Sequence, residues 1–149
     1  LGKVFAMKDD VVGDLGVTEN KQWKDIFDLK LDGANDAPYE KKSLPNYWLN
    51  QYNLLKLPTK KGVTINTITT DKKIIARYRT KYKAQIESME GAALHYIGRD
   101  LSIPFVQIRA VSNYVGERNK AKWKLKESIE QLEAYVLTYL ATLENGLKK

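Results

Sequence analysis

The sequence predicts an α/β domain in which strands and helices alternate. Residues 62–70 form a run dense in β-branched side chains, as strands do. Residues 105–111 form a second, mostly apolar run of strand length. Helical patterns stand between and after these runs, at residues 72–82, 91–98 and 120–145. Such alternation is typical of α/β folds with right-handed crossovers.

The first third of the chain gives weaker signals. Residues 2–7 predict a strand, and residues 9–16 predict a turn-rich loop. Apolar and polar side chains alternate at residues 26–31, which is a weak strand signal. Residues 32–53 are rich in Gly, Asn, Asp, Pro and Tyr and have no sustained period. Because long irregular segments within a domain are often functional, we expect this one near a binding site.

The later elements have clearer capping and periodicity. Asp71 is placed to cap the helix that follows it. Residues 91–98 contain no charged side chain, which predicts a helix buried on most sides. The run at 105–111 predicts a parallel strand covered on both faces. Apolar residues advance by three or four positions from Leu125 to Leu140, as on one face of a long helix that closes the domain.

Composition favours one globular domain over residues 1–149. Hydrophobic residues make up 43% and charged residues 29% of the chain, which excludes a disordered protein. No cysteine is present, so there is no disulfide framework. The sequence contains no apolar run long enough for a membrane helix and no signal-peptide pattern at its start. We therefore expect a cytoplasmic protein without a membrane partner.

The net charge of +7 raises the question of a nucleic-acid partner. The basic residues occur as scattered pairs among many acids, and only Arg77, Arg79, Lys81 and Lys83 approach a stripe. A nucleic-acid interface usually concentrates charge on one face of a recognisable module. We therefore expect no nucleic-acid partner, and a non-catalytic basic binding module is a remote alternative. The positive field would also attract an anionic small molecule.

Polar clusters at residues 88–90 and 112–114 are expected beyond the carboxyl ends of strands, where α/β sheets bind ligands. Glu90 precedes the uncharged helix. It is either a helix-terminus acid stabilised by the macrodipole or a carboxylate that accepts hydrogen bonds from two sugar hydroxyls. Met89, beside it, either fills the core or offers the ligand an adaptable apolar surface.

Asn113 ends the apolar strand and has two interpretations. Asn is a common turn former, but its amide nitrogen also carries two donors that match N7 and O6 of a 6-oxopurine. Ser112 either orients that amide or simply ends the strand. Arg109 lies within an apolar run, which predicts a structural ion pair. His95 is the one histidine, and we expect a core residue there and no metal site.

Residues 87–93 (Glu-Ser-Met-Glu-Gly-Ala-Ala) and 104–113 (Pro-Phe-Val-Gln-Ile-Arg-Ala-Val-Ser-Asn) resemble the nucleoside phosphorylase/nucleosidase superfamily. Within it, residues 112–120, 12–16 and 62–67 are similar to the futalosine hydrolase family. The resemblance implies a mixed central sheet flanked by helices. It implies hydrolysis of the N-glycosidic bond of futalosine, with release of hypoxanthine, in menaquinone biosynthesis. It also implies no cofactor, a small nucleoside substrate and a homodimer or larger homo-oligomer.

The resemblance further implies roles for single residues. Glu90 would bind the ribose hydroxyls, and Met89 would pack against the sugar. Asn113, with Ser112 beside it, would contact the base and assist its departure as a leaving group. Relatives that act on adenine nucleosides typically have Asp at the position of Asn113, which favours a 6-oxopurine here.

Other parts of the family pattern leave alternatives open. The aromatic residue that stacks on the base has no counterpart at residues 70–73, so a residue of segment 32–53 is a candidate substitute. Arg118 and Lys120 are candidates for contact with the substrate's carboxylate. The family's first strands, glycine-rich segment and water-activating acid precede the part matched here, so we expect these 149 residues alone to be inactive. A purine nucleoside phosphorylase and a methylthioadenosine/S-adenosylhomocysteine-type nucleosidase are the alternative functions.

Overall fold

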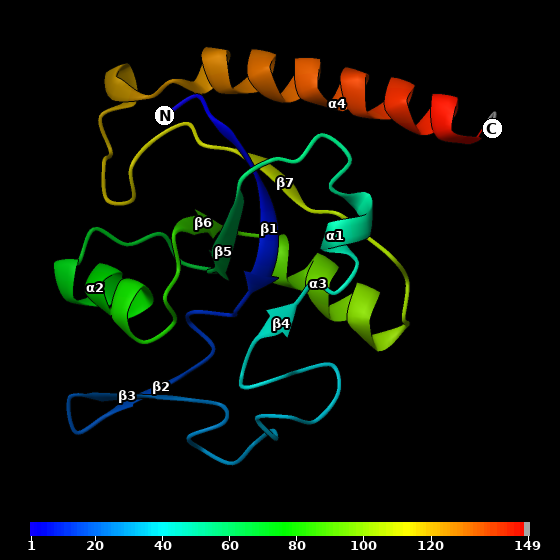
Figure 1. Cartoon of the computed structure of the whole chain (residues 1–149). Coiled ribbons are helices and arrows are strands. Elements are labelled where there is room, and N and C mark those ends of the chain that lie inside the picture. The colour runs from blue at the N-terminus through cyan, green and yellow to red at the C-terminus, as the bar shows by residue number, and fades with distance from the viewer. Residues whose placement is uncertain (148–149) are drawn as a thin grey trace.

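The computed structural model describes residues 1–147 and has an α/β fold built on a mixed sheet (Figure 1). The sheet has five strands: β1 (Val4–Asp10), β4 (Leu44–Pro45), β5 (Thr59–Thr64), β6 (Ile86–Ser88) and β7 (Ile108–Ala110). β1 pairs in parallel with β5, which pairs in parallel with β6. β4 and β7 pair antiparallel with β1. The predicted α/β class and mixed central sheet are confirmed, while residues 148–149 of the predicted domain lie outside the described part.

The helices surround this sheet and follow the strands in alternation. They are α1 (Leu49–Tyr52), α2 (Lys72–Thr80), α3 (Gly91–Asp100), the 3-10 turn η1 (Lys120–Lys122) and α4 (Leu125–Leu147). α4 crosses the end of the sheet nearest the N-terminus, and α2 lies on the side of β6 (Figure 1). Within residues 1–147, no helix has the length and apolar character needed to cross a membrane.

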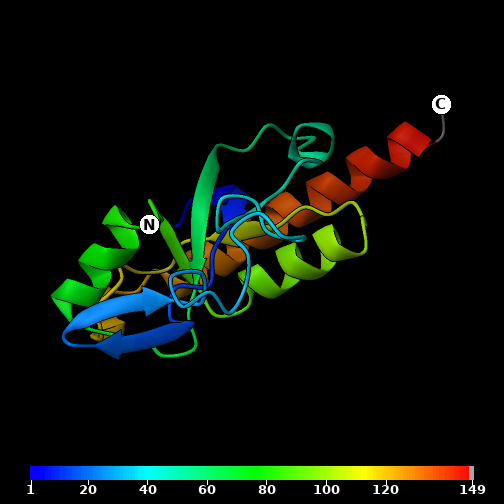
Figure 2. The same ribbon diagram turned by 90° about the horizontal axis from the view of Figure 1, so that it is seen from below.

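A separate hairpin of β2 (Gly16–Glu19) and β3 (Gln22–Asp25) lies beside α2, as Figure 2 shows from below. The Trp23 indole donates to the Tyr82 hydroxyl at 2.9 Å, and the Arg77 guanidinium lies 4.0 Å from the Trp23 ring centroid. The sequence did not predict this hairpin, because all four residues of β2 are exposed and no buried face marks the strand.

Several predicted strand boundaries are wrong. β1 extends to Asp10, beyond the predicted strand at 2–7, and residues 26–31 form turns rather than a strand. The strand predicted at 62–70 ends at Thr64. Beyond that point the Asp14 carboxylate accepts from the backbone N–H groups of Asn66 (2.6 Å) and Thr67 (3.0 Å), which draws the chain away from the sheet.

The strand predicted to be parallel at 105–111 is shorter and antiparallel. β7 pairs Phe5 with Arg109, at the edge of β1 that faces away from β5. The chain enters β7 beside Ala6 and leaves it beside Val4, opposite to the direction of β1. Its three residues are half-buried rather than covered on both faces.

Both apolar helices are less buried than predicted. Asp71 does cap α2, accepting from the Lys73 N–H at 2.7 Å. On α3 only one face is buried, and the large side chains on the other face are exposed: Leu94, Tyr96 and Ile97. On α4 the predicted apolar face is largely exposed, and the helix instead turns its neighbouring face inward, with Ser128 and Tyr139 buried. Ser128 Oγ donates to the Val111 carbonyl at 3.0 Å.

Candidate functional site

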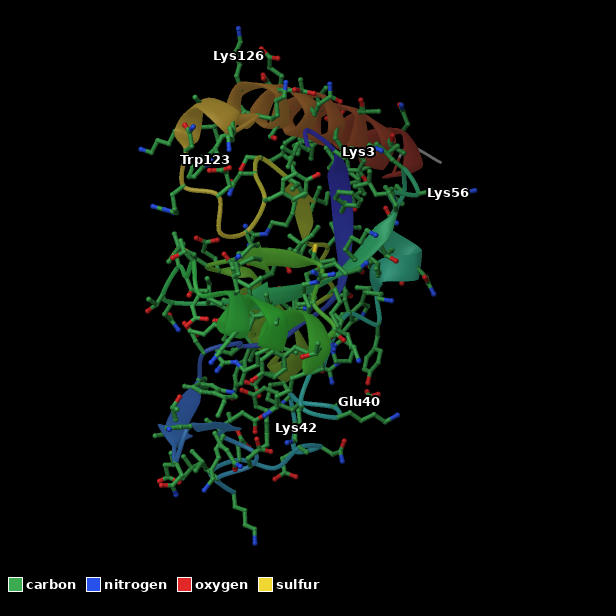
Figure 3. The ribbon with its side chains drawn as sticks, turned by 90° about the vertical axis from the view of Figure 1, so that its left-hand side faces the viewer. Lys3, Glu40, Lys42, Lys56, Trp123 and Lys126 are labelled. Carbon is green, nitrogen blue, oxygen red and sulfur yellow. The ribbon has the colours of Figure 1, made fainter. Side chains whose placement is uncertain are left out.

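A cavity of about 850 Å³ lies between α2, β6 and the segment that follows β7. Figure 3 faces this side of the molecule and labels two of its lining residues, Lys3 and Trp123, below α4. The cavity includes all three residues of β6 and Arg109 and Ala110 of β7, together with the segments that follow both strands. Because β6 is parallel to β5 and β1 while β7 is antiparallel to β1, the carboxyl ends of β6 and β7 lie at opposite ends of the sheet. The cavity therefore extends along the strands, whereas the sequence predicted that ligand-binding side chains would gather beyond their carboxyl ends. Four predicted site residues line it: Met89, Ser112, Asn113 and Arg118.

Glu90 and Lys120 do not line this cavity. Lys120 lies in η1 and is exposed. Glu90 is the residue immediately before α3, and its side chain is 72% exposed. Its carboxylate accepts from Arg109 Nη1 at 3.3 Å, and Arg109 lines the cavity. The predicted ion pair of Arg109 is therefore confirmed, and it holds Glu90 at the cavity's rim.

The Ser112 hydroxyl orients the Asn113 amide. Ser112 Oγ donates to Asn113 Oδ1 at 2.8 Å, which directs the amide nitrogen away from that contact. Asn113 Nδ2 donates to the Tyr114 carbonyl at 3.1 Å. Since the amide nitrogen carries two hydrogens, one of them remains for a ligand. Asn113 is not among the residues with positive φ, so its type is not required by a left-handed turn.

The walls of the cavity carry more basic than acidic side chains. The acidic ones are Glu87 and Glu117, and the basic ones are Lys3, Lys60, Arg79, Arg109 and Arg118. Glu117 pairs with Lys122 Nζ at 2.9 Å, and this hydrogen bond lowers the pKa of the Glu117 carboxyl. The excess of positive charge suits an anionic ligand.

Segment 32–53 does not line the cavity, so the prediction that it lies near this site is wrong. The segment packs against α3 instead. His95 Nδ1 donates to the Leu44 carbonyl at 2.6 Å, and Arg99 Nη1 donates to the Pro45 carbonyl at 2.8 Å. His95 is fully buried, which confirms the predicted core histidine, and burial lowers its pKa. The segment is held by these donors and contributes no aromatic ring to the site.

Aromatic rings reach the cavity from several elements, and of these rings the sequence had placed only Tyr114 in a candidate site cluster. Phe5, Tyr78, Tyr114 and Trp123 line it. Tyr114 is exposed and offers a face on which a purine can stack, whereas Tyr78 is buried in the core. Their approach depends on how β1, α2 and the segment after β7 meet, which local sequence patterns do not specify.

Sequence reasoning also missed Glu87, whose position on β6 was the available signal. Glu87 is the middle residue of β6, and Met89 follows the end of that strand. Glu87 is half-buried and lines the cavity with Met89. Burial raises the pKa of its carboxyl, and the neighbouring Asp14 adds to that rise. Within residues 1–147, no three His, Asp or Glu side chains are grouped as metal ligands would be.

The mixed sheet flanked by helices is the fold of nucleoside phosphorylases and nucleosidases. The family model of the phosphorylase superfamily matches residues 55–141, which include β5, β6, β7, α2 and α3. The chain therefore belongs to the phosphorylase superfamily.

Within that family, the chain is 30% identical over 152 residues to the futalosine hydrolase of Thermus thermophilus; the match covers 100% of this chain and 65% of that protein. The structure of 5′-methylthioadenosine nucleosidase from Arabidopsis thaliana superposes with a TM-score of 0.66 at 22% identity, over 95% of this chain and 54% of that one. A futalosine hydrolase mutant of Helicobacter pylori gives a TM-score of 0.65 at 15% identity, over 95% and 60%. The chain thus spans less than two thirds of each of these relatives.

Proposed function

We propose that the protein hydrolyses the N-glycosidic bond of futalosine and releases hypoxanthine, a step of menaquinone biosynthesis. The observation that carries the proposal is the oriented amide of Asn113 at the cavity wall, since Ser112 fixes its oxygen and leaves an amide hydrogen for the base. The 30% identity to a futalosine hydrolase supports the same substrate.

The proposed reaction passes through a ribosyl cation with oxocarbenium character. As the glycosidic bond breaks, its electron pair moves onto the departing purine. Asn113 Nδ2 would donate to N7 or O6 and stabilise that negative charge. Water then attacks the anomeric carbon, and the proton it loses balances the one taken up by the purine. A 6-oxopurine fits this donor, whereas the 6-amino group of adenine is itself a donor.

In this proposal, the turn between β6 and α3 binds the sugar. Glu90 lies at the rim, where its carboxylate can accept from two vicinal ribose hydroxyls. Arg109 holds that carboxylate from the cavity side at 3.3 Å. Met89 lines the cavity and would pack against the sugar. Arg118, which also lines the cavity, is the proposed contact for the substrate's carboxylate.

The proposal is tested by following base release from futalosine, inosine and methylthioadenosine with the full-length protein. We expect hypoxanthine from futalosine at the same rate with and without phosphate. A phosphate requirement would indicate a phosphorylase instead. Faster release of adenine from methylthioadenosine would indicate an adenine-directed nucleosidase.

We also propose a homodimer or larger homo-oligomer. Val136, Leu137 and Leu140 are exposed on α4, and such apolar side chains are costly to leave in water. Light scattering on the full-length protein measures the oligomeric state, and a monomer at micromolar concentration would contradict this proposal.

A further inference from the structure

The N-terminal turn of α3 is capped by two strands rather than by the residue before the helix. Glu90 is the N-cap residue, but its side chain makes no capping hydrogen bond. The Gly91 N–H donates to Ser88 Oγ on β6 at 3.2 Å, and the Ala92 N–H donates to Thr64 Oγ1 on β5 at 2.7 Å. Two of the free amides at the helix start are thus satisfied by hydroxyls from the sheet.

Asp10 sets the direction of the stronger of these contacts. Thr64 Oγ1 donates to Asp10 Oδ1 at 2.9 Å. Because a hydroxyl has one hydrogen, that donation leaves only acceptor capacity on Thr64 Oγ1 for the Ala92 amide. Asp10 is fully buried, so water does not compete for the hydroxyl hydrogen. The carboxylate therefore fixes Thr64 as an acceptor.

The packing around Asp10 is close. A Cβ at Gly91 would lie 2.4 Å from Asp10 Oδ2, and one at Gly62 would lie 2.5 Å from it. These two glycines let the helix start and β5 approach the carboxylate. Any side chain at Gly91 would push the turn outward and lengthen the contact between Ala92 and Thr64.

The hydroxyl caps of α3 affect where the Glu90 carboxylate lies. A carboxylate at the start of a helix is stabilised by the free amides and the positive end of the helix dipole. Here the sheet hydroxyls already occupy the Gly91 and Ala92 amides. Glu90 instead extends outward to Arg109 at 3.3 Å.

We infer that Asp10 and Thr64 are positioning residues for Glu90: by holding the Ala92 amide, they keep the Glu90 carboxylate out of the helix cap and available for the ribose hydroxyls. The role of the freed carboxylate rests on the proposed function, whereas its position does not. Neither Asp10 nor Thr64 lines the cavity, so they act through Glu90 rather than by touching substrate.

The test replaces Thr64 by Val, which keeps its shape and removes the hydroxyl, and by Ser as the matched control. In a crystal structure of Thr64→Val, we expect the Glu90 carboxylate to turn inward and accept from the Ala92 N–H. In Thr64→Ser it should remain at Arg109. A Thr64→Val structure in which Glu90 still contacts Arg109 would overturn the inference, whether or not the protein is a nucleosidase.

Kinetics give the second measurement. We expect Thr64→Val to raise KM for the nucleoside about tenfold, the order of effect of losing a hydrogen bond to a charged group, with a smaller change in kcat. Thr64→Ser should restore KM. In a Glu90→Gln background the Thr64→Val effect should shrink to less than about twofold, since both changes act on one contact. Additive effects would mean that Thr64 does not act through Glu90.

Thr64→Ala provides a second variant if Thr64→Val fails to fold. It also removes the hydroxyl that accepts from the Ala92 N–H, so the same inward turn of Glu90 and a similar rise in KM are expected. An unchanged Glu90 position in Thr64→Ala, with KM also unchanged, would then overturn the inference. If the wild-type protein cleaves no nucleoside, the proposed function fails and the crystal structures alone decide this inference.

Discussion

Two polar regions meet at α3, and they differ in whether hydrogen-bonding groups remain free for a ligand. At segment 32–53, side-chain donors from α3 bind backbone carbonyls: His95 donates to Leu44, and Arg99 donates to Pro45. At the cavity, Asn113 retains an amide hydrogen, and Glu90 extends into solvent. Polar side chains are therefore structural in one region and available for a ligand in the other.

Hydrogen-bonding groups that remain free, rather than a long irregular segment, mark the candidate site. Segment 32–53 is long and irregular, which favoured a binding role, yet buried donors of α3 account for its conformation. The cavity instead follows β6, β7 and the segments after these two strands. Substitutions in the two regions should therefore affect different measurements.

The largest effect is expected from Asn113→Ala. Losing the donor to the departing purine should lower kcat/KM by about 10²- to 10³-fold, as removal of an oxyanion-type donor does. Asn35→Ala is the matched control, because Asn35 lies in segment 32–53 and its Oδ1 accepts only a local bond from the Lys41 N–H at 2.8 Å. Steady-state kinetics on both variants checks the comparison. A comparable loss of kcat/KM in Asn35→Ala would indicate that segment 32–53 contributes to the site.

His95→Ala should show the opposite pattern. His95 is fully buried and packs against the Phe105 ring at 4.7 Å, so truncation creates a cavity and leaves the Leu44 carbonyl without its donor. We expect the free energy of unfolding in urea to fall by about 3–4 kcal/mol. KM of the folded fraction should change little. A normal stability would show that segment 32–53 is not held by this contact.

Asp10 should make stability depend on pH. Burial raises the pKa of its carboxyl from 3.8 to about 6, so the folded state binds the proton more tightly than the unfolded state. The stabilisation is complete below pH 3.8 and is lost as pH rises through about 6, amounting to about 2–3 kcal/mol.

The Asp10→Asn variant isolates this contribution. Its unfolding free energy, relative to the wild type, should increase between pH 4 and pH 7 and level off above that range. Urea titrations at each pH measure the difference. His95, whose lowered pKa opposes the trend, is present in both proteins and cancels. A constant difference across pH would contradict the raised pKa of Asp10.

The smallest effects separate Arg118 from Lys120. Arg118 lines the cavity and Lys120 does not, although the sequence favoured them equally. We expect Arg118→Ala to raise KM for futalosine about tenfold through loss of a charge-assisted contact. Lys120→Ala should change KM less than about twofold. Equal effects would mean that the carboxylate is bound outside this cavity.

The sequence predicted several residues that line the cavity, but it predicted the strands around them less well. Met89, Ser112 and Asn113 were found because short polar clusters interrupt apolar runs at strand ends, a signal that local sequence carries. The direction of β7 was not predictable, since an apolar run does not say which edge of β1 it joins. The exposed apolar face of α4 likewise escaped prediction, because periodicity shows an amphipathic helix but not which face meets the sheet.

The resemblance-based roles of Glu90, Met89 and Asn113 remain predictions, and the contacts around them sharpen those predictions. Sequence patterns could not show that Ser112 orients the Asn113 amide or that Thr64 and Ser88 cap α3 in place of Glu90. Each of those contacts joins side chains to groups whose positions depend on the folded backbone. Spacing along the chain therefore identified the residues but not their hydrogen-bond directions.

The most direct test of a 6-oxopurine site is the ratio of kcat/KM for inosine to that for adenosine, measured without phosphate in the wild type and in Asn113→Asp. The wild type should favour inosine by at least about 10²-fold, because its amide donates where adenine carries an amino group. Asn113→Asp should lower that ratio by about tenfold or more, since a protonated carboxyl can donate to N7 and its second oxygen can accept from the amino group. A wild-type preference for adenosine, or a ratio that Asn113→Asp leaves unchanged, would contradict base recognition by Asn113.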